Sequence, residues 1–195
     1  MRNFVVLLGA PFVGKTALGS RVSAQWGYAF LDMGTAFRKR REEDPVFNSL
    51  ISSYMDSRVM VPDHITIGFF SRLLEEAGDQ VFISGFPRTE AQLKWFLEEH
   101  GDRNHIRIAY LEISRDESRE ISFLDAPDRA GRTDGGKFER GWEEWEQQTV
   151  PVVDFCQMAF QRAGRVSFSR LPWISPRPKI EVRVKALSDL LAVSI

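Results

Sequence analysis

The residues with the clearest chemical potential lie near the start of the chain, in segment 9–16. Two glycines, Gly9 and Gly14, enclose four other residues and are followed by Lys15 and Thr16, which is the phosphate-binding loop pattern. Backbone N–H groups of such a loop, and the start of the helix after it, point at phosphate oxygens. Lys15 would reach the outer phosphates, and the Thr16 hydroxyl would bind a magnesium ion. The predicted nucleoside triphosphate site consists of Gly9, Ala10, Pro11, Phe12, Val13, Gly14, Lys15 and Thr16.

Arginines form the second chemical feature, because several follow apolar runs or lie in a segment rich in Gly and Asp. A phosphoryl transfer between two nucleotides must gather several phosphate groups in one site. The planar guanidinium binds phosphate oxygens bidentately and stays charged at all working pH values. These arginines therefore favour a phosphotransferase. They are Arg38, Arg88, Arg119, Arg129, Arg132 and Arg140.

Two other classes of nucleotide protein share the phosphate loop pattern: hydrolases or switch proteins, and nucleotide-sensing proteins. The Asn-Lys-x-Asp motif of a GTPase switch does not occur in the sequence, and the apolar run 81–83 ends in Ser84, where a motor-type ATPase would carry an acid. Only Glu112 ends another such run. Both absences disfavour a hydrolase. A nucleotide-sensing protein without catalysis stays open as the third class.

The elements that must position these residues alternate along the chain, short apolar runs with longer helical patterns. This alternation predicts an α/β fold, a three-layer P-loop sandwich whose five-stranded parallel sheet has helices on both faces. The expected strands are 4–8, 28–31, 81–84, 107–112 and 165–169. The helical patterns cover 16–25, 65–77, 90–99, 139–163 and 180–191, and Pro151 is expected to kink the fourth.

Two segments are expected to be inserts on one domain that spans residues 1–195. Segment 37–61 is helical and charged, while segment 125–138 is rich in Gly, Asp and Arg and poor in apolar residues. A polar segment without a core of its own is typical of a mobile surface element.

Composition excludes some partners. With 43% hydrophobic residues, the 195-residue chain is long enough for one packed domain. Its 26 basic and 27 acidic residues give a net charge of −1, which argues against attachment to nucleic acid or membrane by bulk charge. The single cysteine, Cys156, cannot form an internal disulfide and lies in an apolar helical stretch, so it is expected to pack. The N-terminal apolar run is too short to span a membrane. We expect a cytoplasmic protein.

Four motifs, in order along the chain, resemble those of the adenylate kinase family of nucleoside monophosphate kinases. The most specific is segment 85–89, Gly-Phe-Pro-Arg-Thr, followed by Gln92. The others are Gly34 with Arg38, segment 55–63, and segment 131–134 followed by 149–151. Together these motifs span nearly the whole chain.

The resemblance implies two nucleotide sites, and it makes segment 37–61 the monophosphate-binding insert and segment 125–138 the short lid. ATP with its magnesium ion would lie on the phosphate loop, Lys15 would follow the transferred phosphate, and Arg119 would pack on the ATP base. In the lid, Arg132 and Arg140 would reach the phosphates on closure, helped by Arg129. The monophosphate site would comprise Met33, Gly34, Arg38, Val59, Val61, Gly85, Arg88 and Gln92. Arg38 and Arg88 would hold the phosphate, and Gln92 would bind the base. Lys15, Arg88, Arg132 and Arg140 would be the catalytic residues.

Several positions depart from the family pattern. Ser84 and Thr35 stand where acids are expected near the metal, Phe12 replaces a glycine of the loop, and Met33 replaces a threonine that contacts the base. A hydroxyl is a much weaker magnesium ligand than a carboxylate. Asp32, in a turn that resembles that of bacterial cytidylate kinases, would either supply a missing acid or only cap the turn.

We therefore expect a nucleoside monophosphate kinase that transfers the γ-phosphoryl group of ATP and acts as a monomer. AMP is the favoured acceptor because the Gln92 amide offers both a donor and an acceptor. CMP, UMP or a deoxynucleotide is the alternative, as is a catalytically weakened, regulatory nucleotide-binding protein of the same fold. The lid segment carries no cysteine, which excludes a zinc-bearing lid.

Overall fold

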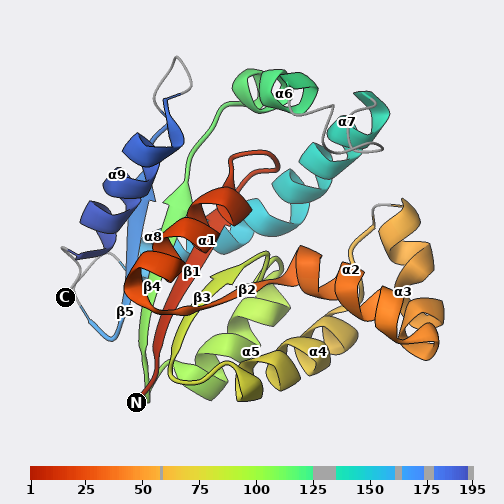
Figure 1. The fold of residues 1–195 in the computed structure, drawn as a ribbon, viewed down its shortest axis with the longest axis horizontal. Helices are drawn as coiled ribbons and strands as arrows, with labels where there is room; N and C mark the ends of the chain where they lie inside the picture. Colours follow the sequence, from red (N-terminus) through yellow and green to blue (C-terminus); the bar gives the residue numbers. More distant parts are fainter. Residues whose placement is uncertain (58, 125–134, 161–163, 174–177, 193–195) are drawn as a thin grey trace.

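A five-stranded parallel sheet forms the centre of the protein (Figure 1). The computed structural model describes residues 1–57, 59–124, 135–160, 164–173 and 178–192. The strand order is β2-β3-β1-β4-β5. The strands are β1 (Asn3–Gly9), β2 (Ala29–Asp32), β3 (Gln80–Ser84), β4 (His105–Leu111) and β5 (Val166–Leu171). All five expected strands are present, so the predicted α/β class with a parallel sheet is confirmed.

Helices cover both faces of the sheet because the central strand is apolar on both sides. In β1, Phe4, Val6 and Leu8 belong to one hydrophobic cluster, and Val5 and Leu7 belong to the other. The first cluster is completed by α4 (Asp63–Glu76), α5 (Glu90–His100) and α8 (Val150–Ala159). The second is completed by α1 (Lys15–Trp26) and α9 (Ile180–Ala192). Cys156 lies in the first cluster, fully buried, where burial raises its thiol pKa to about 12.

Four further helices lie towards the carboxyl ends of the strands (Figure 1). They are α2 (Met33–Glu43), α3 (Pro45–Ser57), α6 (Arg115–Leu124) and α7 (Gly135–Glu144). Helices α2 and α3 project to one side of the sheet, and α6 and α7 extend beyond its carboxyl edge. Because parallel strands all end at this edge, residues that follow different strands are brought together there.

The long helical pattern 139–163 differs in detail from its prediction. A π-helical segment, η1 (Trp145–Thr149), separates α7 from α8, and the Val150 N–H donates to the Trp145 carbonyl, five residues back. The physical reason is Pro151, which has no N–H and whose ring conflicts with the carbonyl four residues earlier. The interruption therefore lies before the proline rather than at it. Helix α8 ends at Ala159.

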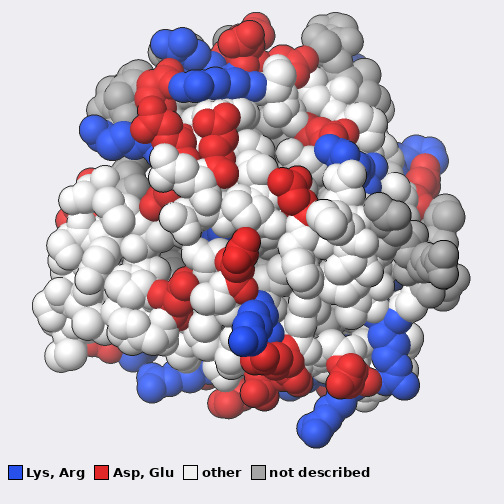
Figure 2. Space-filling view, turned by 180° about the vertical axis from the view of Figure 1, so that it is seen from behind, with Lys and Arg blue, Asp and Glu red and all other residues white. Residues whose placement is uncertain are grey.

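Charge is mixed on the surface seen from behind in Figure 2, where lysine and arginine side chains alternate with aspartate and glutamate side chains. This mixing agrees with the near-neutral net charge of −1. Within the described ranges, each helix is too short or too polar to cross a membrane.

Candidate functional site

The phosphate loop joins the end of β1 to the start of α1. Three of its residues have positive φ angles that L side chains rarely adopt, Gly9 at 152°, Phe12 at 61° and Gly14 at 90°. A Cβ added at Gly9 would lie 2.7 Å from the Leu111 carbonyl oxygen, so β4 leaves room only for glycine there. Phe12 tolerates its unusual backbone conformation while its ring packs on Phe138, with centroids 5.9 Å apart.

Two side chains from distant parts of the chain hold this loop in place. The Ser118 hydroxyl, buried at the start of α6, donates to the Pro11 carbonyl at 2.7 Å. Arg183, on α9, donates to the Val13 carbonyl at 2.8 Å. The loop is therefore anchored from both sides, which lowers the entropy lost when a phosphate binds.

Lys15 is folded back over the loop. Its ammonium donates to the Gly9 carbonyl at 2.7 Å and to the Ala10 carbonyl at 2.8 Å. Burial and the nearby positive charge of Arg88 lower the pKa of Lys15 to about 7, while the Asp32 carboxylate partly offsets them. A bound polyphosphate would supply the missing negative charge and restore the charged form.

Asp32 performs two functions at the end of β2. One carboxylate oxygen, Oδ1, accepts from the Thr35 N–H at 2.8 Å and so caps α2. The other, Oδ2, accepts from the Thr16 hydroxyl at 3.0 Å. Burial alone would raise the pKa of Asp32, but the hydrogen bonds from Thr35 and Thr16 and the nearby Ser84 hydroxyl hold it below its ordinary value. The aspartate is thus an ionised acid at the phosphate loop as well as a cap.

Arg88 lies beyond the end of β3 and faces the same region. A Cβ added at Gly85 would lie 3.4 Å from the Arg88 Nη2 atom and 3.5 Å from the Met33 Cβ atom, so both the guanidinium and Met33 lie close against that turn. The side chain reaches solvent, yet the surrounding protein still lowers its pKa through burial. Glu144 and Asp32 oppose this shift, and the charge of Arg38 adds to it.

The charges of Lys15, Arg38 and Arg88 are therefore gathered near two carboxylates at one edge of the sheet. Arg38 is exposed on α2, where its Nη2 donates to the Thr35 hydroxyl at 2.9 Å. A Cβ added at Gly34 would lie 3.3 Å from the Arg38 Nη1 atom. Gly34 thus leaves the guanidinium room beside the turn.

Gln92 is 2% exposed and is hydrogen-bonded within the protein. Its Oε1 accepts from the Arg88 N–H at 2.8 Å, and its Nε2 donates to Asp63 Oδ1 at 2.7 Å. Thr89 donates to the same carboxylate oxygen at 2.9 Å. These bonds fix the backbone that carries Arg88. Binding of a base by Gln92 stays a prediction and would require the amide to exchange or share these partners.

The remaining predicted residues are distributed around this edge. Val61 is buried, whereas Val59 is 56% exposed. Arg119, on α6, forms an ion pair with Glu139 at 3.5 Å, and Arg140 is exposed on α7. Arg129 and Arg132, with segment 125–134 of the predicted lid, lie outside the described residues. Residues 135–138 form the first turn of α7.

Sequence reasoning missed Glu144, the last residue of α7. Its Oε1 accepts from the Met60 N–H at 2.6 Å, and its charge acts on Arg88. Burial raises the pKa of Glu144, partly offset by the Met60 hydrogen bond and by Arg88. Arg183 and Ser118 were also missed. None of the three stands in a recognisable motif, because each acts through a contact with a distant segment.

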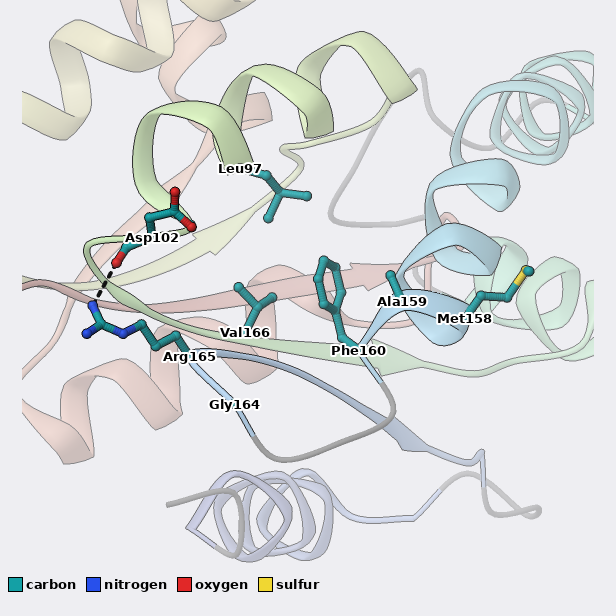
Figure 3. A pocket seen from close by; sticks show the side chains of 9 residues that line it. Leu97, Asp102, Met158, Ala159, Phe160, Gly164, Arg165 and Val166 are labelled. Atoms are coloured by element: carbon teal, nitrogen blue, oxygen red, sulfur yellow. Dashed lines mark hydrogen bonds between the residues drawn. The ribbon is translucent and has the colours of Figure 1, made fainter.

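An open hollow of about 840 Å³ lies at the other end of the sheet (Figure 3). Phe160, Met158 and Leu97 contribute apolar side chains to it, and the Arg165 guanidinium donates to the Asp102 carbonyl at 2.7 Å along its rim. Val166, another lining residue, is the first residue of β5. The hollow therefore lies at the amino edge of the strands, away from the phosphate loop, and it plays no part in the candidate site.

Comparison with known proteins adds an independent observation. No family model matches the chain. The UMP-CMP kinase of Xenopus tropicalis is 28% identical over 177 residues, which cover 85% of this chain and 88% of that protein. The adenylate kinase of Synechococcus sp. (strain JA-2-3B'a(2-13)) is 27% identical over 192 residues, covering 95% of both chains. The chain is a homologue of the nucleoside monophosphate kinases.

A third relative, the adenylate kinase of Bacillus subtilis (strain 168), is 34% identical over 102 residues, which cover 50% of this chain and 47% of that protein. The family resemblance expected from the motifs is thereby confirmed. The names of these relatives specify different acceptor bases, uracil and cytosine for the UMP-CMP kinase and adenine for the adenylate kinases. Homology alone therefore leaves the base that this chain accepts to be argued from its site.

Proposed function

We propose that this protein is a nucleoside monophosphate kinase that transfers the γ-phosphoryl group of ATP to a nucleoside monophosphate, giving two diphosphates. The observation that carries the proposal is the gathering of Lys15, Arg38 and Arg88 beside the phosphate loop. A loop for the donor phosphates and two arginines for the acceptor phosphate at the same edge suit two nucleotides that react with each other.

The chemistry needs no covalent intermediate. An oxygen of the acceptor phosphate attacks the γ-phosphorus, while the bond from that phosphorus to the β–γ bridging oxygen breaks and ADP leaves. Lys15 would follow the transferred group, and Arg88 would hold the acceptor phosphate in line with it. Positioning and charge neutralisation supply most of the catalysis in such reactions. Arg132 and Arg140 are proposed to add positive charge from the lid side, with Arg129 assisting.

A magnesium ion is proposed to accompany ATP, and the oxygen donors at the loop suit it. The Thr16 hydroxyl is exposed at the start of α1, and oxygen is the ligand type that magnesium prefers. When bound, the ion would neutralise charge on the triphosphate. Zinc has no proposed role.

AMP remains the favoured acceptor, because the Gln92 amide could offer a donor and an acceptor to the adenine edge. CMP or UMP is the second candidate. It is favoured by Met33, which is buried beside Gly85 where a base-contacting threonine was expected, and by the relatives named UMP-CMP kinase. We also propose a monomer that resides in the cytoplasm.

The test is a panel in which the purified protein receives ATP, magnesium and each of AMP, CMP, UMP and their deoxy forms. Diphosphate products are measured by chromatography, and ATP binding is measured on the same preparation. We expect diphosphates from one acceptor far above the rest. If ATP binds but no acceptor yields a diphosphate, the kinase proposal is wrong, and a regulatory nucleotide-binding protein takes its place.

A further inference from the structure

We propose that Asp32 supplies the carboxylate of the magnesium site in this protein, together with the Thr16 hydroxyl. The inference rests on the proposed use of magnesium and ATP, and it assigns that use to a residue of β2. Ser84 and Thr35, where acids were expected from the family pattern, offer only hydroxyls.

The first argument is the distance between the two oxygens. Asp32 Oδ2 and Thr16 Oγ1 are 3.0 Å apart. Two oxygens bound side by side to one octahedral magnesium ion, each at 2.0–2.1 Å, are separated by about 2.9 Å. The pair therefore has the spacing of adjacent ligands, and rotation of the Thr16 hydroxyl would free both oxygens for the ion.

The second argument is the orientation of the carboxylate. The Thr35 N–H holds Oδ1 at 2.8 Å, so the aspartate keeps one rotamer and directs Oδ2 at the loop. Thr16 is exposed, which leaves the oxygen pair accessible to an incoming nucleotide. A carboxylate already held in position loses little entropy when it binds a ligand.

The third argument is an unpaired polar group beside this carboxylate. Ser84 pairs in register with Asp32 on the neighbouring strand and is 1% exposed. In the part of the chain that the structure describes, its hydroxyl has no hydrogen-bond partner of normal geometry, although it lies close enough to lower the pKa of Asp32. Buried hydroxyls are seldom left unpaired. A water molecule carried by a magnesium ion would provide the missing partner.

The site is incomplete without ATP. Within the described ranges, the acidic, histidine and cysteine side chains form no group of three that could hold a metal ion. Lys15 and Arg88, on whose charges Asp32 acts, would also oppose a free cation at this carboxylate. The negative phosphates of ATP would neutralise these positive charges and add the remaining oxygen ligands of the ion. We therefore expect magnesium to bind with ATP and not alone.

The experiment compares ATP binding with and without magnesium by titration calorimetry in the wild type, Asp32→Asn and Asp32→Ser. Asparagine and serine both remain good helix caps, so α2 keeps its start while the charge is lost. We expect magnesium to tighten ATP binding at least tenfold in the wild type and less than threefold in both variants. In parallel, the electron paramagnetic resonance spectrum of Mn²⁺ with ATP should lose its protein-bound signal in the variants.

The matched control is Asp44→Asn. Asp44 caps α3 through the Val46 and Phe47 N–H groups, each at 3.0 Å, and so shares the charge and the capping role of Asp32. The Asp44→Asn variant should leave the tightening of ATP binding by magnesium unchanged. Adding Ser84→Asp to Asp32→Asn should restore part of that effect from the neighbouring strand.

An unchanged effect of magnesium in both Asp32 variants would overturn the inference, and an equal loss in Asp44→Asn would do so as well. The readout does not depend on phosphoryl transfer. If the acceptor panel yields no diphosphate while the effect of magnesium still requires Asp32, the kinase proposal fails and the magnesium assignment stands.

Discussion

The Arg183 guanidinium donates a hydrogen bond to the Val13 carbonyl at 2.8 Å and lies over the Trp173 ring, 4.5 Å from its centroid. The two bonded residues are 170 positions apart in the chain. Through this contact α9 supports the phosphate loop, although no residue of α9 stands in a nucleotide-binding motif. Helix α9 thereby supports the proposed donor site.

Replacing Arg183 with methionine should weaken ATP binding about tenfold while the fold is kept. The physical reason is the loss of a charged hydrogen bond worth roughly 1.5–3 kcal/mol, which leaves the loop less well ordered. Titration calorimetry with ATP measures the effect. Lys185→Met, on an exposed position of the same helix, is the control. Equal affinity in wild type and Arg183→Met would show that the loop is rigid without α9.

Replacing Arg88 with alanine should lower the rate of phosphoryl transfer by about a thousandfold or more and leave the affinity for ATP nearly intact. An arginine that neutralises charge in a phosphoryl transfer contributes effects of about this size. Steady-state rates and ATP titration are measured on the same variant. Arg103→Ala, an exposed arginine at the amino edge of β4, should change neither. If Arg88→Ala instead loses ATP binding, Arg88 belongs to the donor site.

Binding of ATP should take up protons above neutral pH. The pKa of Lys15 is about 7 without ligand and should rise once phosphates lie beside it, so a neutral lysine gains a proton on binding. Affinity should therefore fall as pH rises from 7.5 to 9. Calorimetry in two buffers of different ionisation enthalpy measures the uptake, which should vanish in Lys15→Met. Proton release on binding would contradict the assignment.

Replacing Glu144 with glutamine should tighten binding of the acceptor monophosphate a few-fold. Glutamine keeps an oxygen for the Met60 N–H but removes the negative charge that partly neutralises Arg88. Glu144→Ala should also lower the free energy of unfolding by about 1–3 kcal/mol, because the Met60 N–H loses its partner. Acceptor KM and thermal melting measure the two effects.

The neighbouring exposed residue provides the control, since Glu143→Gln removes an equal charge from the same helix. A weaker acceptor site in Glu144→Gln would mean that this carboxylate positions Arg88 rather than opposing its charge.

The order of strands along the chain, the apolar faces and the phosphate loop could all be predicted, because each depends on neighbours within a few residues. The expected strand 4–8 lies within β1, and the predicted helix 90–99 lies within α5. The interruption at η1 was harder to predict, because a proline signals a break without indicating on which side the helix rearranges.

The sequence by itself determined the fold class and the place of the predicted phosphate loop between β1 and α1, because periodicity and local motifs specify them. Tertiary structure decided which side chains complete the site. From the sequence, Asp32 was either a helix cap or an acid near the metal, and the fold brings the Thr16 hydroxyl to its second carboxylate oxygen at 3.0 Å. The sequence likewise left the hydrogen-bond partners of the Gln92 amide unknown, and in the structure its Nε2 donates to Asp63. Arg183 and Glu144 act across 170 and 84 residues. Such contacts exist only once the sheet has brought separate segments together, and no local pattern encodes them.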